Sequence, residues 1–169
     1  MARLPAVGED SGNWGTVLNE YLGTAHNADG TLKLDVKTIA DLKAIDVTTL
    51  TDKQQALVAG YTTPGDGGGG VFYYDAGAST ADNGGTVIAP SAGAGRWIRN
   101  YSGPVNVRWF GAKGDGVADD TTAFTNALAT LPDGGTLDLP PDATYLLSQT
   151  VVLTRPVIIR GGAKENTTV

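Results

Sequence analysis

Three acidic residues close together are the first candidates for chemistry. Asp115, Asp119 and Asp120 could supply paired carboxylates, which act as general acids and bases or bind hard cations. Their spacing lacks the alternating acids and terminal Glu of an EF-hand loop. Asp119 and Asp120 instead precede an apolar helical pattern, where an oxygen acceptor caps the first turn, and Asp115 stands between two glycines. We predict that all three are structural caps, with no catalytic residue or metal site among them.

Two other features could suggest cofactor chemistry. The glycine run Gly67 to Gly70 leads into a strand pattern and is not followed by Gly-Lys-Ser or Gly-Lys-Thr, so we interpret it as a turn and not as a phosphate-binding loop. The chain contains no Cys and a single His, His26, so thiol catalysis, Cys-based zinc sites and His pairs are excluded. No cofactor is expected.

Aromatic and arginine side chains alternate near residue 100. In the strand pattern from Arg96 to Tyr101, residues Trp97, Arg99 and Tyr101 must share one face. Such a face could stack on a sugar, but aromatic and Arg pairs in an antiparallel sheet more often support the sheet or an interface. We predict a trimer or domain interface that contains Trp97, Arg99, Tyr101 and Trp109.

Residues 1–36 form the first of three predicted modules. An apolar helical stripe of about ten residues ends near Gly23, and a helix this short is marginal on its own because isolated helices below about 12–15 residues seldom hold in water. The stripe therefore needs a partner surface, which is either a neighbouring module or a groove in another protein. Its residues are the predicted virion-docking positions Trp14, Val17, Leu18, Tyr21 and Leu22.

Residues 37–103 are predicted to form a small α+β domain. A short helix is expected over 38–45, and β-branched and aromatic runs bounded by turn residues predict an antiparallel sheet. Its strands are expected at 56–59, 71–74, 86–89 and 96–101.

Residues 104–169 predict the start of a β-solenoid. A strand over 105–110 and a tight loop over 111–116 precede a helix with Phe124, Ala127, Leu128 and Leu131 on one face. Short, evenly spaced strands are expected at 136–139, 144–147, 150–153 and 156–160. Because a solenoid needs about three repeats to cover its core, we expect this chain to be the front part of a longer protein.

Composition excludes several classes of protein. The chain of 169 residues has 41% hydrophobic and 18% charged residues, which indicates a folded protein, and its apolar runs are too short for a membrane span. The net charge of −6, with scattered Lys and Arg, argues against nucleic-acid binding. The N-terminus lacks the apolar region of a signal peptide, so cytoplasmic synthesis is expected.

One motif resembles a known superfamily. The run Phe110 to Gly116, the following Asp119-Asp120-Thr121 and the later run Gly135 to Pro141 are similar to the N-terminal motif of pectate-lyase-like right-handed β-helices. One departure is Trp109, at a position that is often acidic in that superfamily. The resemblance implies a helix that plugs the N-terminal end of a β-helix, a structural role.

The upstream residues resemble the N-terminal regions of phage tailspike and tail-fibre proteins. Residues 3–33 are similar to the short anchor of many phage tail proteins, and residues 39–99 to the small head- or particle-binding domain that precedes the β-helix in such spikes. The resemblance rests mainly on this order of parts. It implies a mostly β fold with short helices: an N-terminal anchor helix, a small antiparallel β-domain and the helix-capped start of a right-handed parallel β-helix.

The resemblance also implies partners and location. The chain is expected to form a homotrimer in the virion tail, to dock on phage tail, baseplate or adaptor proteins, and to reach host surface polysaccharide through a further C-terminal body. Such a parent could be a polysaccharide lyase or glycosidase, with its catalytic acids on later rungs, while no activity is expected of this chain. A secreted bacterial pectate-lyase-like protein is disfavoured because a signal peptide is not evident.

Overall fold

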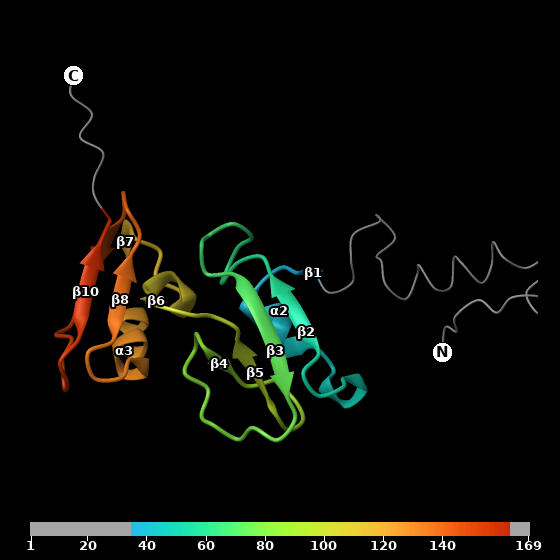
Figure 1. Cartoon of the computed structure of the whole chain (residues 1–169). Coiled ribbons are helices and arrows are strands. Elements are labelled where there is room, and N and C mark those ends of the chain that lie inside the picture. The colour runs from blue at the N-terminus through green and yellow to red at the C-terminus, as the bar shows by residue number, and fades with distance from the viewer. Residues whose placement is uncertain (1–34, 163–169) are drawn as a thin grey trace, which may run out of the picture. The chain divides into compact units, whose positions relative to one another are not determined.

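The structure, a computed structural model, describes residues 35–162 (Figure 1). The described residues from Val36 onward belong to one unit of the chain. We call residues 35–103 the sheet domain and residues 104–162 the β-helix start. The predicted stripe from Trp14 to Leu22 lies outside the described residues.

The sheet domain is built on five strands in the order β1-β2-β3-β5-β4. β3 pairs antiparallel with both β2 and β5, and β4 pairs antiparallel with β5. The four strands predicted in this region are confirmed, with small shifts at their ends. The bounds are β1 (Asp35–Val36), β2 (Gln55–Val58), β3 (Gly70–Asp75), β4 (Val87–Ile88) and β5 (Arg96–Arg99).

Alternation along β5 places Trp97 and Arg99 on the buried face of this sheet. Both side chains are buried, whereas Ile98 between them is half-buried, so their predicted common face is confirmed. The predicted short helix is present as α2 (Ile39–Ala44), and its buried residues Ile39 and Leu42 pack in the first core. The first core consists of Val36, Ile39, Leu42, Val47, Ala56, Val58, Phe72, Tyr74, Ile88 and Trp97.

A capping box fixes where α2 begins. The Thr38 hydroxyl accepts a hydrogen bond from Asp41 N at 3.2 Å, while the Asp41 carboxylate accepts one from Thr38 N at 3.0 Å. These reciprocal bonds satisfy backbone donors that the first turn of a helix leaves free. The 3-10 turn η1 (Val47–Thr49) follows, with the Asp46 side chain accepting from Thr48 N.

The prediction of one strand over 105–110 is wrong. Only β6 (Val105–Asn106) is extended, and η2 (Val107–Phe110) is a 3-10 turn. The physical reason is local: the Asn106 side chain accepts from Arg108 N at 2.9 Å, which caps the turn, and Gly111 ends it with a φ of 90°. The expected tight loop is also shorter, because Asp115 and Gly116 already belong to β7 (Asp115–Asp119).

The predicted helix is present as α3 (Thr121–Thr130). Phe124, Ala127 and Leu128 are buried on its inner face, and Leu131 is the buried C-cap residue. They pack with η2 and with the strand β8 (Thr136–Leu139) into a second core. This core consists of Val105, Val107, Phe110, Ala112, Ala123, Phe124, Ala127, Leu128, Leu131 and Leu137.

Parallel strands beside α3 begin the β-helix. β8 (Thr136–Leu139) lies between β6 and β10 (Ile158–Gly161), and β7 pairs in parallel with β9 (Thr144–Leu146). The register aligns Val105 with Leu137 and Leu137 with Ile159, so apolar residues occupy equivalent positions in successive strands. The predicted mostly β fold with short helices is confirmed for the described residues.

One predicted strand, 150–153, is not a strand in the structure. Val152 and Leu153 are exposed, and this segment pairs with no ladder in the described part of the chain. β-branched residues therefore do not form a strand here, because a strand requires a neighbour for its backbone groups. Among residues 35–162, no helix is long and apolar enough to cross a membrane.

Candidate functional site

Three of the four predicted interface residues, Arg99, Tyr101 and Trp109, lie at or near the junction of the sheet domain with the β-helix start. The fourth, Trp97, does not. Trp97 is 1% exposed and packs against Tyr74, with ring centroids 5.5 Å apart, inside the first core. The first core encloses its side chain, which leaves no exposed surface for a second subunit. Its predicted place in an interface is therefore corrected to one in the core.

Arg99 is the centre of the junction. Its guanidinium donates to three carbonyl oxygens: Nε to Gly85 at 3.0 Å, one terminal nitrogen to Gly69 at 2.6 Å and the other to Gly68 at 2.8 Å. Burial lowers the pKa of Arg99 to about 10, so the side chain is still a cation at neutral pH. The sheet domain thus contains a buried positive charge that three backbone carbonyl groups stabilise.

Two aromatic rings complete the surroundings of this cation. The guanidinium carbon lies 4.5 Å from the ring centroid of Phe72 in β3 and 4.8 Å from that of Trp109 in η2. Tyr101, which is 41% exposed, meets the same Trp109 edge to face at 5.1 Å. Arg99, Tyr101 and Trp109 therefore come together, and they join the two parts of the chain by cation–π and aromatic contacts.

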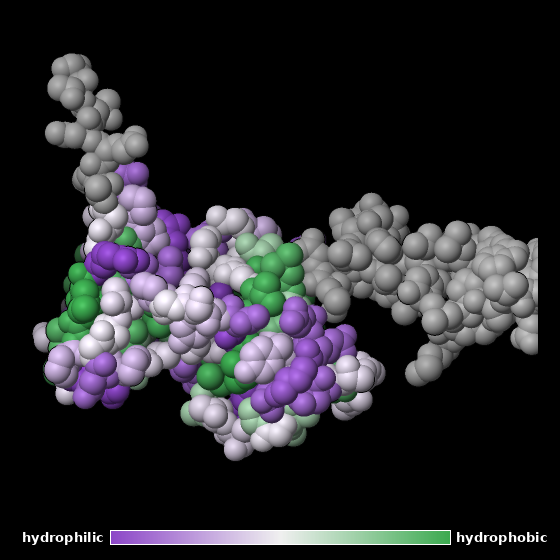
Figure 2. Space-filling model, in the orientation of Figure 1, coloured by the Kyte–Doolittle hydropathy of each residue, from purple (hydrophilic) through white to green (hydrophobic). Residues whose placement is uncertain are grey.

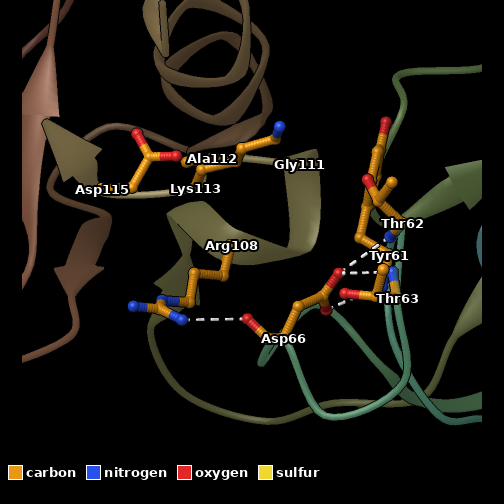
Figure 3. A pocket seen from close by; sticks show the side chains of 9 residues that line it. All are labelled: Tyr61, Thr62, Thr63, Asp66, Arg108, Gly111, Ala112, Lys113 and Asp115. Atoms are coloured by element: carbon orange, nitrogen blue, oxygen red, sulfur yellow. Dashed lines mark hydrogen bonds between the residues drawn. The ribbon is translucent and has the colours of Figure 1, made fainter. Parts of the chain in front are cut away.

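Arg108 makes a second connection that the sequence did not reveal. Its side chain donates to the backbone oxygen of Asp66 at 3.0 Å. A cavity of about 300 Å³ lies between the loop from Tyr61 to Asp66 and the turn from Arg108 to Asp115 (Figure 3). In this view the charged ends of Arg108 and Lys113 point away from each other, so the cavity does not gather its charges around one ligand position.

Asp66 shapes the sheet-domain wall of this cavity. Its carboxylate accepts hydrogen bonds from the backbone N–H groups of Tyr61, Thr62, Thr63 and Gly68 at 2.8–3.0 Å. Burial alone would raise the pKa of the Asp66 carboxyl, but these four bonds outweigh burial and lower it. The Gly65-Asp66-Gly67 sequence is the signal that could have revealed this turn, because Asp between glycines favours such bonds to its own backbone.

The three predicted caps have different partners. The Asp115 carboxylate accepts from Ala118 N and Val117 N, which lowers its pKa. Asp119 accepts from the hydroxyls of Ser148 and Thr121 and from Thr121 N, and these bonds lower its pKa well below the usual value.

Asp120 does not act as predicted. It occupies the N-cap position of α3, but its side chain makes no capping hydrogen bond. The buried carboxylate instead accepts from Lys113 N at 2.7 Å and Gly114 N at 3.1 Å. Asp119 is the residue whose carboxylate binds the first amide of α3, because Asp120 is turned toward the preceding loop. No cluster of His, Cys, Asp and Glu in residues 35–162 is arranged to hold a metal ion.

Comparisons with protein families agree with this division of the chain. Residues 35–102 match the family described as phage tail protein small four-stranded beta-sheet domain. Residues 104–169 match the family described as rhamnogalacturonase A/epimerase, pectate lyase-like. The two matches meet next to Pro104, between the sheet domain and the β-helix start.

Similar proteins come from phages and a prophage. The Mu-like prophage FluMu defective tail fiber protein of Haemophilus influenzae is 40% identical over 98 residues, which are 56% of this chain and 15% of that protein. The tailspike protein of Acinetobacter baumannii phage AM24 is 25% identical, with a TM-score of 0.60 over 76% of this chain and 22% of its own. The chain therefore spans less than a quarter of either relative.

A further tailspike is represented by two structures. Tailspike protein 2 of bacteriophage CBA120 is 29% identical at full length, with a TM-score of 0.55 over 72% of this chain and 16% of its own. Its enzymatically active domain is 28% identical, with a TM-score of 0.56 over 73% of this chain and 18% of that structure. Because residues 104–169 are less than half of this chain, the second match must include part of the sheet domain.

In this chain, a match to a phage tail sheet domain is therefore followed directly by a match to a pectate-lyase-like domain. The chain is similar to phage tailspike and tail-fibre proteins.

Proposed function

We propose that this chain is the N-terminal region of a tailspike and attaches a receptor-binding or depolymerase body to the phage tail or baseplate. The observation that supports this most is the direct joining of a phage-tail sheet domain to the first strands of a β-helix. Arg99 and Trp109 make this joint rigid, since a desolvated cation–π contact contributes about 2 kcal/mol. A rigid joint suits a protein that must hold a long body in a fixed direction.

Residues 1–36 are the proposed anchor. The sequence places Trp14, Leu18 and Tyr21 on one apolar stripe, which suits a groove in a tail or adaptor protein. In a homotrimer, three anchors would bind together, and each need bind only weakly because the others raise its effective concentration.

Tyr101 and Trp109 are the proposed contribution of the described residues to a trimer interface. Tyr101 is exposed and sits on the half-buried Trp109, whereas Trp97 and Arg99 are enclosed within the chain. Aromatic residues of this kind are enriched where subunits meet.

We also propose that this region belongs to a longer protein. The remaining part of that protein would bind and depolymerise polysaccharide. The support is the match to the enzymatically active domain of a tailspike. For this chain we propose no enzymatic activity, because in such spikes the catalytic acids are expected on later rungs or between subunits. Incubation of the purified chain with capsular polysaccharide should release no new reducing ends, and any cleavage would contradict this assignment.

The attachment proposal is tested by incorporation into virions. A Trp14→Glu or Leu18→Glu variant places a charge on the stripe and should abolish incorporation, while Asn19→Glu adds the same charge off the stripe and should incorporate normally. Circular dichroism should show that all three keep the fold of residues 35–162. Normal incorporation of both stripe variants would show that this segment is not the anchor.

A further inference from the structure

The sheet domain contacts the β-helix start through several independent elements. In addition to Arg99 on Trp109, the Asn83 side-chain amide donates to the Thr130 hydroxyl at 3.3 Å. Asn83 also accepts from three backbone N–H groups of residues 85–87. One polar side chain therefore fixes a sheet-domain loop and binds the end of α3.

Two glycines bring the parts into close contact. A Cβ atom at Gly85 would lie 2.5 Å from Cε1 of Phe110, and one at Gly111 would lie 2.6 Å from Cε1 of Tyr61. Real side chains cannot occupy such positions without displacing the ring. At these two points the two parts are therefore in direct van der Waals contact, beside the cavity described above.

The contacted residues are those that set the first turn of the β-helix. η2 directly continues β6, and Val107 and Phe110 of η2 are buried in the second core with α3. Holding η2 fixes the position of β6, whose Val105 is aligned with Leu137 of β8. The sheet domain thus contacts the helix and the turn from which the parallel ladder starts.

We propose that the sheet domain has a second function besides attachment: it is an N-terminal folding cap that fixes the first turn of the β-helix. Arg99 is the positioning residue of this cap. Its three carbonyl partners lie in the sheet domain, and its π-face contact to Trp109 extends the same rigid group into η2. Lys cannot replace it, because an ammonium lacks the planar fork that reaches three acceptors while stacking on two rings.

Hydrogen exchange of the full chain, read by mass spectrometry, tests this function. Arg99→Met should make amides of η2 and α3 exchange roughly thirtyfold faster, the fold-change that corresponds to the loss of a desolvated cation–π contact. Arg99→Lys should show the same loss. Arg96→Met is the matched control, because Arg96 lies on the same strand and donates to three carbonyls, of Thr80, Gly95 and Ser79, that all belong to the sheet domain.

A variant on the other side of the contact keeps the proposal testable if the Arg99 variants do not fold. Trp109→Leu changes only the β-helix side of the contact, and it should speed exchange at residues 66–72, because coupling between two sites acts in both directions. The proposal is overturned if Arg99→Met accelerates η2 and α3 no more than Arg96→Met does. It is also overturned if Trp109→Leu leaves the exchange rates of residues 66–72 unchanged. If Arg99→Met does not fold, the result for Trp109→Leu alone decides the test.

Discussion

The sheet domain and the β-helix start differ in how completely they bury their apolar residues. Phe72 and Ile88 of the sheet domain are fully buried, whereas Ile158 and Val152 of the β-helix start are 56% and 71% exposed. Figure 2 shows hydrophobic residues at the surface of both parts, but the numbers separate a closed core from an open one. The antiparallel sheet and its helix enclose their core, while β10, the last described strand of the parallel ladder, leaves Ile158 and Ile159 exposed.

The largest expected effect comes from emptying the closed core. Trp97→Ala should destabilise the sheet domain by about 3–5 kcal/mol, the range for truncating a large aromatic side chain in a core. Urea denaturation followed by far-UV circular dichroism measures this loss. A loss below about 1 kcal/mol would mean that the sheet domain is not the closed unit described above.

A somewhat smaller effect is expected at the centre of the parallel ladder. Leu137 is fully buried in β8 between two other strands, so Leu137→Ala should cost about 2–4 kcal/mol. Hydrogen exchange should place the loss in residues 104–162. Equal losses of hydrogen-exchange protection in both parts would contradict this expectation. They would show that the two cores unfold as a single, tightly coupled unit.

Acid should weaken the loop that borders the junction. Because the Asp66 pKa is lowered on folding, its stabilisation is present above the ordinary value of about 3.9 and is lost as pH falls through the folded value. The difference in melting temperature between the native chain and Asp66→Asn should therefore be largest above about pH 5 and shrink toward about pH 2. A difference that does not vary with pH would contradict the assigned role of this carboxylate.

The smallest effect is expected at the open end. Ile158→Ser removes an apolar side chain that is already 56% exposed, so the free energy of unfolding should change by no more than about 0.5 kcal/mol. Ile88→Ser, in the closed core, is the matched change and should be far more costly. Similar costs for both substitutions would remove the distinction between closed and open cores.

The sequence predicted the elements whose signals are local. Alternation placed Trp97 and Arg99 on one face, and helical spacing found α3, because both patterns are set by neighbouring residues. The prediction of a strand over 105–110 was wrong because the hydrogen bond that the Asn106 side chain accepts from Arg108 N stabilises a turn within a run of β-prone residues. The strand expected over 150–153 failed because strand formation depends on a partner that local sequence does not reveal.

The junction was predictable only in part. Of the predicted interface residues, Arg99, Tyr101 and Trp109 lie close together in the structure, whereas Trp97 lies in the core. An interface between subunits stays a prediction. Arg108 and Asn83 were not found, since their partners Asp66 and Thr130 are separated from them by 42 and 47 residues. Contacts over such separations require the fold itself.

The most direct test of the attachment role is the solution mass of the chain, measured by light scattering alone and after mixing with spike-free phage tails. The account predicts a trimer that joins the tails, and loss of joining when Trp14 is replaced by Glu. A monomer that leaves the tails unchanged would contradict it.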